Sequence, residues 1–206
     1  MNNDHILRRG LLSYFSEAQL MRIEACRVGI AGAGGLGSNC AMNLVRSGFK
    51  NLTVVDFDLV EPPNLNRQFF FPDQVGMPKV EALRDNLMRL NPHLELKIHN
   101  ERVTAENAQA LFHGCTVIVE AFDLPQEKQM LVERFYHSQV LLIAASGLAG
   151  WQDSDFLVTR KINHNFYVVG DAESETGPGS PPCAPRVGIA AAKQANLILA
   201  HALGEL

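Results

Sequence analysis

Short apolar runs alternate with amphipathic segments along most of the chain. The apolar runs predict strands, and the segments with apolar positions at helical spacing predict helices. The predicted strands span residues 28–31, 52–55, 95–99, 116–120 and 140–144. The predicted helices span residues 15–25, 36–47, 79–90, 104–112, 126–136 and 187–203. Residues 156–161 and 165–169 predict an antiparallel hairpin that turns at Asn163-His164. This order is typical of an α/β fold: a Rossmann-like doubly wound, mostly parallel sheet with a C-terminal antiparallel extension.

The chain has 206 residues, enough for one α/β domain, and we expect a single domain over residues 1–206. Residues 1–25 are expected to form an N-terminal helical arm. Residues 171–186 are rich in Gly, Pro, Ser and Glu, which predicts a mobile loop. Residues 58–78 form another long connection, and long loops inside a compact domain are often functional.

Composition narrows the classes of function. The net charge is −4 with no basic block, so we do not expect a nucleic-acid partner. The four cysteines form no CxxC pair, and no zinc site is expected. The N-terminus lacks the apolar stretch of a signal peptide, and residues 187–203 are too polar for a membrane span. We therefore expect a cytoplasmic protein that is not bound to a membrane.

A glycine-rich turn joins the first predicted strand to the following helix. Its glycines are Gly32, Gly34, Gly35 and Gly37. Glycines at this spacing permit a tight turn and a close backbone approach, and the helix N-terminus favours a phosphate. The pattern predicts a nucleotide site, against the alternative of a tight turn in any such sheet. By itself it does not separate a dinucleotide from ATP.

Two acids follow the second predicted strand. Asp56 is placed to accept hydrogen bonds from ribose hydroxyls, and its alternative is a turn or cap residue. Asp58 is a nucleotide-site candidate with the same alternative. Asp123 follows another buried strand, at an edge of the sheet where phosphates would bind. It is a candidate Mg²⁺ ligand, because Mg²⁺ takes few carboxylates besides phosphate oxygens, and its alternative is the N-cap of the next helix.

The connection after Asp56 carries side chains suited to phosphate. Arg67 offers a planar, permanently charged fork, and its alternative is a surface arginine packed over a neighbouring phenylalanine. Asn64 and Gln68 are placed to hold either the loop or the ligand. Lys79 stands at a predicted helix start, where a cation opposes the helix dipole unless an anion binds there. The alternative for Lys79 is an ordinary exposed lysine.

These motifs together resemble the ThiF/MoeB/HesA family, the bacterial relatives of ubiquitin-activating enzymes. The resemblance runs from about Arg8 to Gly204. It is closest to the short ThiF-like members linked to thiamine biosynthesis. The segments that carry it are GAGGLGSN, DFDLVEPPNLNRQ, GMPKVEALRDNLMRLNPH, EAFD and APRVGIAAAKQAN.

The resemblance implies an adenylyltransferase that uses ATP and Mg²⁺. Its partner would be a small ubiquitin-like, ThiS-like sulfur carrier that ends in Gly-Gly. The carrier's C-terminal carboxylate would attack the α-phosphate and release pyrophosphate. The family pattern places Gly34 and Gly35 against the nucleotide and Asp56 on the ribose. The same pattern places phosphate contacts at Asn64, Arg67 and Lys79, and Mg²⁺ at Asp123. Arg67, Lys79 and Asp123 are thus the catalytic candidates.

The resemblance also implies a homodimer, in which an N-terminal arginine reaches the partner's site; Arg8 and Arg9 are the candidates. Cys183 lies on the loop where some members carry a cysteine that links to the carrier, but its spacing favours an ordinary loop cysteine. Pro63 stands where the family often has Ser. Three other functions stay open: adenylation of another carboxylate such as a modified tRNA base, an NAD-dependent oxidoreductase, and a non-catalytic partner subunit.

Overall fold

A seven-stranded sheet with the order β3-β2-β1-β4-β5-β7-β6 forms the centre of the computed structural model, which describes residues 6–206. All neighbouring strands are parallel except β6 and β7, which are antiparallel. The strands are β1 (Arg27–Ala31), β2 (Asn51–Val55), β3 (Glu95–His99), β4 (Val117–Glu120), β5 (Leu141–Ala145), β6 (Val158–Lys161) and β7 (Phe166–Gly170). The predicted α/β class, with its doubly wound sheet and antiparallel extension, is confirmed.

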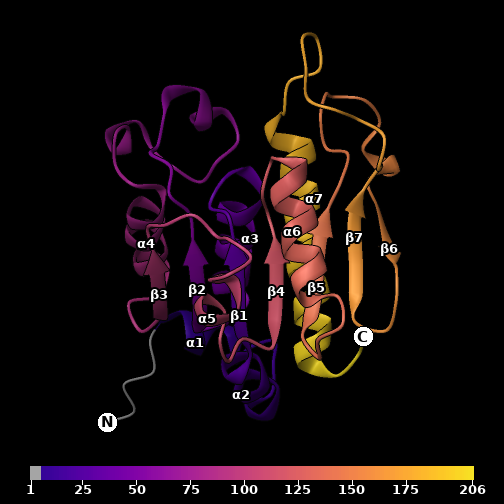
Figure 1. The fold of residues 1–206 in the computed structure, drawn as a ribbon. Helices are drawn as coiled ribbons and strands as arrows, with labels where there is room; N and C mark the ends of the chain where they lie inside the picture. The colour runs from indigo at the N-terminus through magenta and orange to yellow at the C-terminus, as the bar shows by residue number, and fades with distance from the viewer. Residues whose placement is uncertain (1–5) are drawn as a thin grey trace.

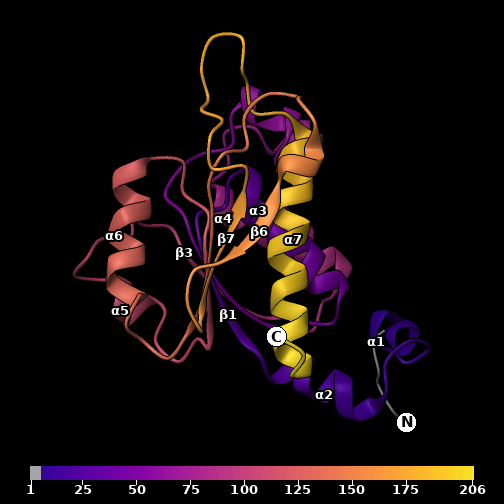
Figure 2. The ribbon, with the colours of Figure 1, turned by 90° about the vertical axis from the view of Figure 1, so that its right-hand side faces the viewer.

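Helices cover both faces of this sheet (Figure 1). Figure 2 shows α5 and α6 on one face, and α3, α4 and α7 on the other. The helices are α1 (Ile6–Leu11), α2 (Glu17–Ala25), α3 (Gly35–Arg46), α4 (Lys79–Leu90), α5 (Ala108–Leu111), α6 (Pro125–Phe135) and α7 (Ala184–Leu203). No helix within residues 6–206 is long and apolar enough to cross a bilayer.

The pleat of the central strands divides their side chains between two apolar layers. Val28 and Ile30 of β1 belong to the layer beneath α3, α4 and α7, whereas Ala31 belongs to the layer beneath α5 and α6. The long helix α7 packs mainly against α3. Its small buried residues Ala190 and Ala191 permit this close approach. Helix α7, predicted over residues 187–203, therefore contributes to the core.

Several predicted boundaries differ from the structure. The helix predicted at 104–112 is only α5, because Thr104 and Asn107 exchange side-chain bonds with each other's backbone N–H and form a turn before it. Helix α2 begins after Ser16, whose hydroxyl accepts the N–H of Gln19. Helix α7 begins at Ala184, three residues earlier than predicted. Residues 1–5 of the predicted N-terminal arm lie outside the described residues.

Candidate functional site

The carboxyl ends of β1, β2 and β4 bring three of the predicted features to the same edge of the sheet. The glycine turn follows β1, Asp56 follows β2, and Asp123 lies three residues beyond β4. In Figure 1 this is the upper edge, where the 58–78 connection and the loop before α7 also rise. Ligands of open α/β sheets bind outside the carboxyl ends of strands, so this edge is the candidate site.

The glycine turn is tight enough to require glycine at two positions. Gly32 has a φ of 103°, and a Cβ there would lie 2.7 Å from the carbonyl oxygen of Ala121. A Cβ at Gly37 would lie 1.8 Å from the carbonyl oxygen of Gly32. At Gly34, by contrast, the nearest atom to a Cβ is the Nε2 of Gln68, at 3.8 Å. Space is therefore left open at the helix N-terminus, where a ligand would approach.

We expect Gly37→Ala and Gly34→Ala to have different effects. Gly37→Ala forces the turn apart and should cost about 1–3 kcal/mol of unfolding free energy. Gly34→Ala should cost less than about 1 kcal/mol, because Gly34 has a φ of −75° and open space. It should nevertheless weaken ATP binding, since the methyl group enters the nucleotide's space. Thermal denaturation and calorimetric titration with ATP check both, and wild-type ATP affinity in Gly34→Ala would contradict the predicted contact.

Asp56 stabilises the glycine turn through its side chain. One carboxylate oxygen accepts the N–H of Ala33 at 2.6 Å, and the other accepts the N–H of Asp58 at 2.8 Å. The structure thus gives Asp56 the turn-forming role that the sequence left as its alternative. Burial raises the pKa of Asp56, and the nearby Lys79 ammonium opposes that rise. A carboxylate offers about four acceptor positions, so ribose hydroxyls still find acceptors there.

Lys79 is buried, which rules out the ordinary exposed lysine. Its side chain is 8% exposed, and its Nζ lies 2.7 Å from an Oδ2 of Asp58, whose side chain is 49% exposed. The backbone N–H of Lys79 also donates to the carbonyl of Asp58. The helix start is therefore folded back onto the end of β2, and a cation is held beside Asp56 at the open edge of the site.

Arg67 extends over the first turn of α3. A Cβ at Gly35 would lie 3.4 Å from the Cγ of Arg67, so the arginine stem packs on this glycine. Asn39 donates to the carbonyl of Arg67 at 2.7 Å and fixes the loop to α3. Burial lowers the pKa of Arg67, and the Asp123 carboxylate opposes that change. The Asp123 carboxylate thus acts electrostatically on the guanidinium.

Asn64 and Gln68 differ in their surroundings. The side-chain oxygen of Asn64 accepts the N–H of Glu61 at 3.0 Å, so this residue shapes the loop. Gln68 is buried, and its Oε1 has no hydrogen-bond partner. Buried polar atoms are almost always paired, so this oxygen is an exception, and the atom of Gln68 nearest to Gly34 is its Nε2.

Asp123 is exposed, and Leu124 occupies the N-cap of α6, so the alternative role as a helix cap is wrong. Other acids stand near it. Partial burial raises the pKa of Glu127, the Arg102 guanidinium opposes this, and the carboxylates of Asp123, Asp58 and Asp56 raise it further. This concentration of negative charge suits a cation.

No three His, Cys, Asp or Glu side chains within residues 6–206 are grouped as a ready-made metal centre. A site with one carboxylate beside a phosphate cradle matches the way Mg²⁺ binds, with few protein ligands and several oxygens from phosphate or water. The residues present therefore fit Mg²⁺ bound together with a nucleotide.

The loop before α7 is tied down by a buried arginine that the sequence reading did not single out. Arg186 is 3% exposed and forms an ion pair with Asp171 at 2.5 Å. It also donates to the carbonyls of Gln152 and Asp153 at 3.0 and 2.9 Å. Burial alone disfavours charge on Asp171, but the N–H groups of Glu173 and Ser174 and the Arg186 guanidinium lower its pKa overall. Only the APRV motif pointed toward this residue.

We expect Asp171→Asn to destabilise the protein by about 3 kcal/mol, because it leaves the buried Arg186 charge without its partner. The same mechanism makes wild-type stability depend on pH. A lowered pKa in the folded state means that the pair's contribution is complete above the ordinary Asp range and disappears as the pH falls through the lowered pKa. Urea denaturation of both proteins at pH 7 checks the first expectation. A free-energy difference below about 0.5 kcal/mol would contradict it.

Two other candidates have definite surroundings. Arg8 bonds to Glu17 and, at 2.8 Å, to Glu24 of its own chain, while Arg9 is exposed. Cys183 is the N-cap residue of α7, and its thiol lies 3.5 Å from the carbonyl of Pro181. The amide of Asn66 donates to the carbonyl of Pro182 at 3.1 Å and links the two loops that rise above the site.

The fold and this edge define a Rossmann-like protein with a glycine-rich turn flanked by cations. Residues 7–199 match the family model described as the ThiF family. The chain therefore belongs to the ThiF family, and the predicted resemblance is confirmed.

Curated relatives include adenylyltransferases from animals and bacteria. The chain is 32% identical over 152 residues to the adenylyltransferase and sulfurtransferase MOCS3 of Anopheles gambiae, a match that covers 72% of this chain and 34% of that protein. It is 33% identical over 147 residues to the molybdopterin-synthase adenylyltransferase of Salmonella typhimurium, covering 71% of this chain and 57% of that protein. The matched region thus spans about a third of the length of the Anopheles protein and just over half of the length of the Salmonella protein.

Solved structures share the fold. The tRNA N6-threonylcarbamoyladenosine dehydratase TcdA of E. coli, crystallised with AMP, has a TM-score of 0.86 at 20% identity and covers 96% of this chain and 94% of that one. E. coli MccB in complex with MccA-N7isoASN has a TM-score of 0.74 at 20% identity, covering 100% of this chain and 66% of that one. These likenesses concern the architecture.

Proposed function

We propose that this protein adenylates the C-terminal glycine carboxylate of a small ubiquitin-like sulfur carrier with ATP and releases pyrophosphate. The carrier is ThiS-like and belongs to thiamine biosynthesis. The observation that carries the proposal is the convergence of buried Lys79, Arg67 and the exposed Asp123 carboxylate around the glycine turn. Sequence relatives named as adenylyltransferases support the reaction class.

In this proposal a carboxylate oxygen of the carrier forms a bond to the α-phosphorus of ATP. The bond from that phosphorus to the oxygen bridging toward the β-phosphate breaks, and pyrophosphate leaves. No general base is required, because the attacking carboxylate is already ionised at neutral pH. The difficulty is electrostatic, since one anion approaches another, so catalysis depends on cations aimed at the phosphates.

The site residues divide this work. The N–H groups of the glycine turn and the start of α3 bind phosphate, and Asp56 binds the ribose. Lys79 and Arg67, with Asn64 and Gln68 beside them, contact the phosphates. Lys79 would exchange its Asp58 partner, 2.7 Å away, for a phosphate oxygen. Asp123 would hold Mg²⁺, which when bound supplies further neutralisation of phosphate charge.

The loop before α7 is the segment that we assign to the carrier tail. It is linked to the Arg67 loop by the bond from Asn66 to Pro182 and anchored at its base by Arg186. A carrier tail that ends in Gly-Gly is slender enough to pass beneath such a loop.

We further propose that the protein is a homodimer, which light scattering of the purified protein tests.

The decisive experiment is exchange of radiolabelled pyrophosphate into ATP in the presence of candidate carriers. We expect exchange that requires both Mg²⁺ and an intact Gly-Gly terminus, and a carrier truncated by two residues is the matched control. Absence of exchange with every carrier, together with tight binding of NAD, would replace the proposal with an oxidoreductase. Exchange with a carboxyl-bearing modified tRNA, and not with carriers, would replace only the substrate.

A further inference from the structure

An ion pair between a buried carboxylate and a partly exposed lysine adjoins the turn that carries Asp123. Glu120 is the last residue of β4 and is 1% exposed. The Nζ of Lys128, from the first half of α6, lies 3.0 and 3.1 Å from its two carboxylate oxygens. The proposed mechanism uses neither side chain.

The pair binds both ends of that turn and the neighbouring elements. An oxygen of Glu120 also accepts the N–H of Phe122 at 2.8 Å, directly before Asp123. Lys128 donates in addition to the carbonyl of Ala145, at the end of β5, at 3.1 Å. From α7, Gln194 donates to the backbone carbonyl of Glu120 at 3.4 Å. Four elements, β4, β5, α6 and α7, therefore meet at this pair.

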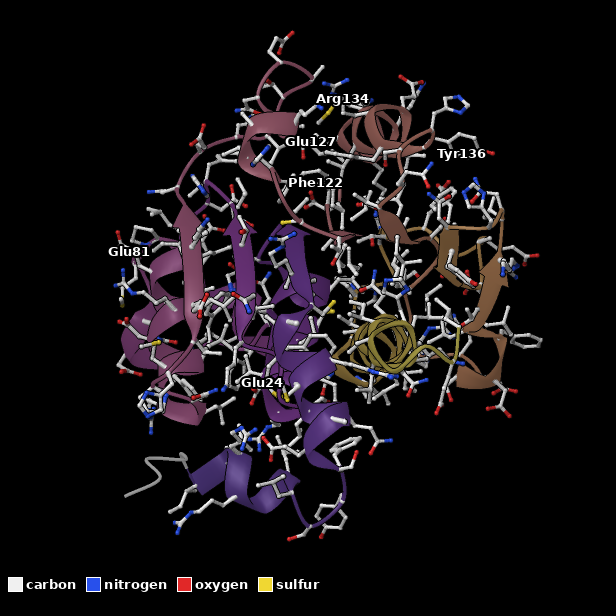
Figure 3. All side chains as sticks on the ribbon, turned by 90° about the horizontal axis from the view of Figure 1, so that it is seen from below. Glu24, Glu81, Phe122, Glu127, Arg134 and Tyr136 are labelled. Atoms are coloured by element: carbon white, nitrogen blue, oxygen red, sulfur yellow. The ribbon has the colours of Figure 1, made fainter. Side chains whose placement is uncertain are left out.

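The rest of the turn has little side-chain support. Helix α6 begins at Pro125, and its N-cap, Leu124, provides no side-chain hydrogen bond. Figure 3 shows Phe122 and Glu127 on the α6 side of the sheet. Asp123 lies between Phe122, which Glu120 holds, and α6, which Lys128 holds.

Burying a carboxylate such as that of Glu120 is expensive even beside a partly exposed ammonium, and a well-packed apolar residue in its place is often as stable or more stable. Burial raises the pKa of Glu120, and the Lys128 ammonium opposes that rise. Stability alone therefore does not account for the pair. Its directional bonds offer something that apolar packing lacks, a defined position for a short turn at the edge of the sheet.

We propose that Glu120 and Lys128 are positioning residues that hold the 121–124 turn in place. They thereby keep the Asp123 carboxylate where it can bind a cation that is also bound to phosphate. This inference rests on the proposed role of Asp123 in binding Mg²⁺. It adds to that role the paired side chains of Glu120 and Lys128, on which the geometry of Asp123 depends. Groups that orient metal ligands typically contribute about 10–100-fold to metal affinity or activity.

The test is the Mg²⁺ concentration that gives half-maximal pyrophosphate exchange. We expect Glu120→Gln and Lys128→Met each to raise it about tenfold. In Glu120→Gln, the side-chain amide either points its NH₂ group at the Lys128 ammonium or loses the hydrogen bond from the N–H of Phe122. In Lys128→Met, the cation is removed. Lys128→Arg keeps the charge and should lie nearer the wild type. Binding of AMP without Mg²⁺, measured by calorimetry, should be unchanged in all three.

Glu24→Gln is the matched control for a broken ion pair. Glu24 pairs with Arg8 and Lys50 at 2.8 and 2.9 Å, and Figure 3 places it on the opposite side of the sheet from Phe122. Glu24→Gln should lower the melting temperature without changing the Mg²⁺ concentration that gives half-maximal exchange. Asp123→Asn is the reference for direct loss of the cation ligand.

The outcomes separate the two hypotheses. An unchanged Mg²⁺ requirement in Asp123→Asn overturns the proposed role of Asp123 itself. A raised requirement in Asp123→Asn, together with wild-type requirements in folded Glu120→Gln and Lys128→Met, overturns only the positioning role. If neither variant folds while Lys128→Arg folds, a requirement between those of the wild type and Asp123→Asn supports the positioning role, and a wild-type requirement overturns it. If none of the three folds, the pair serves stability and the inference is wrong.

Discussion

Replacing Lys79 with alanine is expected to lower carrier-dependent pyrophosphate exchange about 10²–10³-fold, the usual effect of removing one donor to a developing anion. The effect should be large because Lys79 is 7% exposed and its charge acts where water does not screen it. The fold should survive, since the Asp58 carboxylate that loses its partner is half-exposed and remains hydrated. The pKa of Asp56 should rise further, because the ammonium that opposes its burial is gone.

Lys50→Ala is the matched control for this variant. Lys50 also forms an ion pair, with Glu24 at 2.9 Å, but it precedes β2 and lies at the opposite end of the strand from Asp56. Exchange by this control should equal that of the wild type. If Lys79→Ala is folded by circular dichroism and exchanges pyrophosphate at the wild-type rate, the phosphate-binding role of Lys79 is wrong.

Arg67→Ala is expected to lower exchange about 10²-fold, near the lower end of that range, because the guanidinium is only partly buried. Its stem packs on Gly35, so the side chain stands over the start of α3 where phosphate is expected. Arg67→Lys should restore only part of the rate, since a lysine does not reproduce a planar two-point contact. Exchange assays at saturating ATP separate lost rate from lost binding.

Arg84→Ala is the control for Arg67. Arg84 is an exposed arginine of α4 that pairs with the adjacent Asp85. Its removal should leave exchange and the melting temperature unchanged. An equal loss in both variants would mean that exchange depends on overall charge, which would contradict a specific contact by Arg67.

The order of elements was predictable from local patterns. Apolar runs marked β1, β2, β4 and β5, and alternation marked β3. The predicted spans of α4 and β3 agree with the structure residue for residue. Asn91 and Pro92 stop α4, a signal that lies within the segment itself. The helix at 104–112 was overestimated because the Thr104–Asn107 bonds make a turn with the same local sequence preferences as a helix start.

The candidate site was predictable only as a set of residues. The glycine spacing, the acids that follow β2 and β4 and the cation at a helix start can be read along the chain. The family resemblance gave these residues their roles. The burial of Lys79 against Asp58 could not be read this way, because it depends on how the 58–78 connection folds back onto the sheet. The contact of Arg67 with Gly35 is likewise a matter of distant segments meeting.

The sequence by itself determined the fold class, the family and the glycine turn. This was possible because hydrophobic periodicity and glycine spacing are local properties of the chain. Only the tertiary structure decided the partners of the charged side chains. Arg186 meets Asp171 across the loop before α7, and Lys128 meets Glu120 across a helix and a strand. These pairs join side chains that are 15 and 8 residues apart in the sequence and lie on different elements, so their contacts exist only in the folded chain.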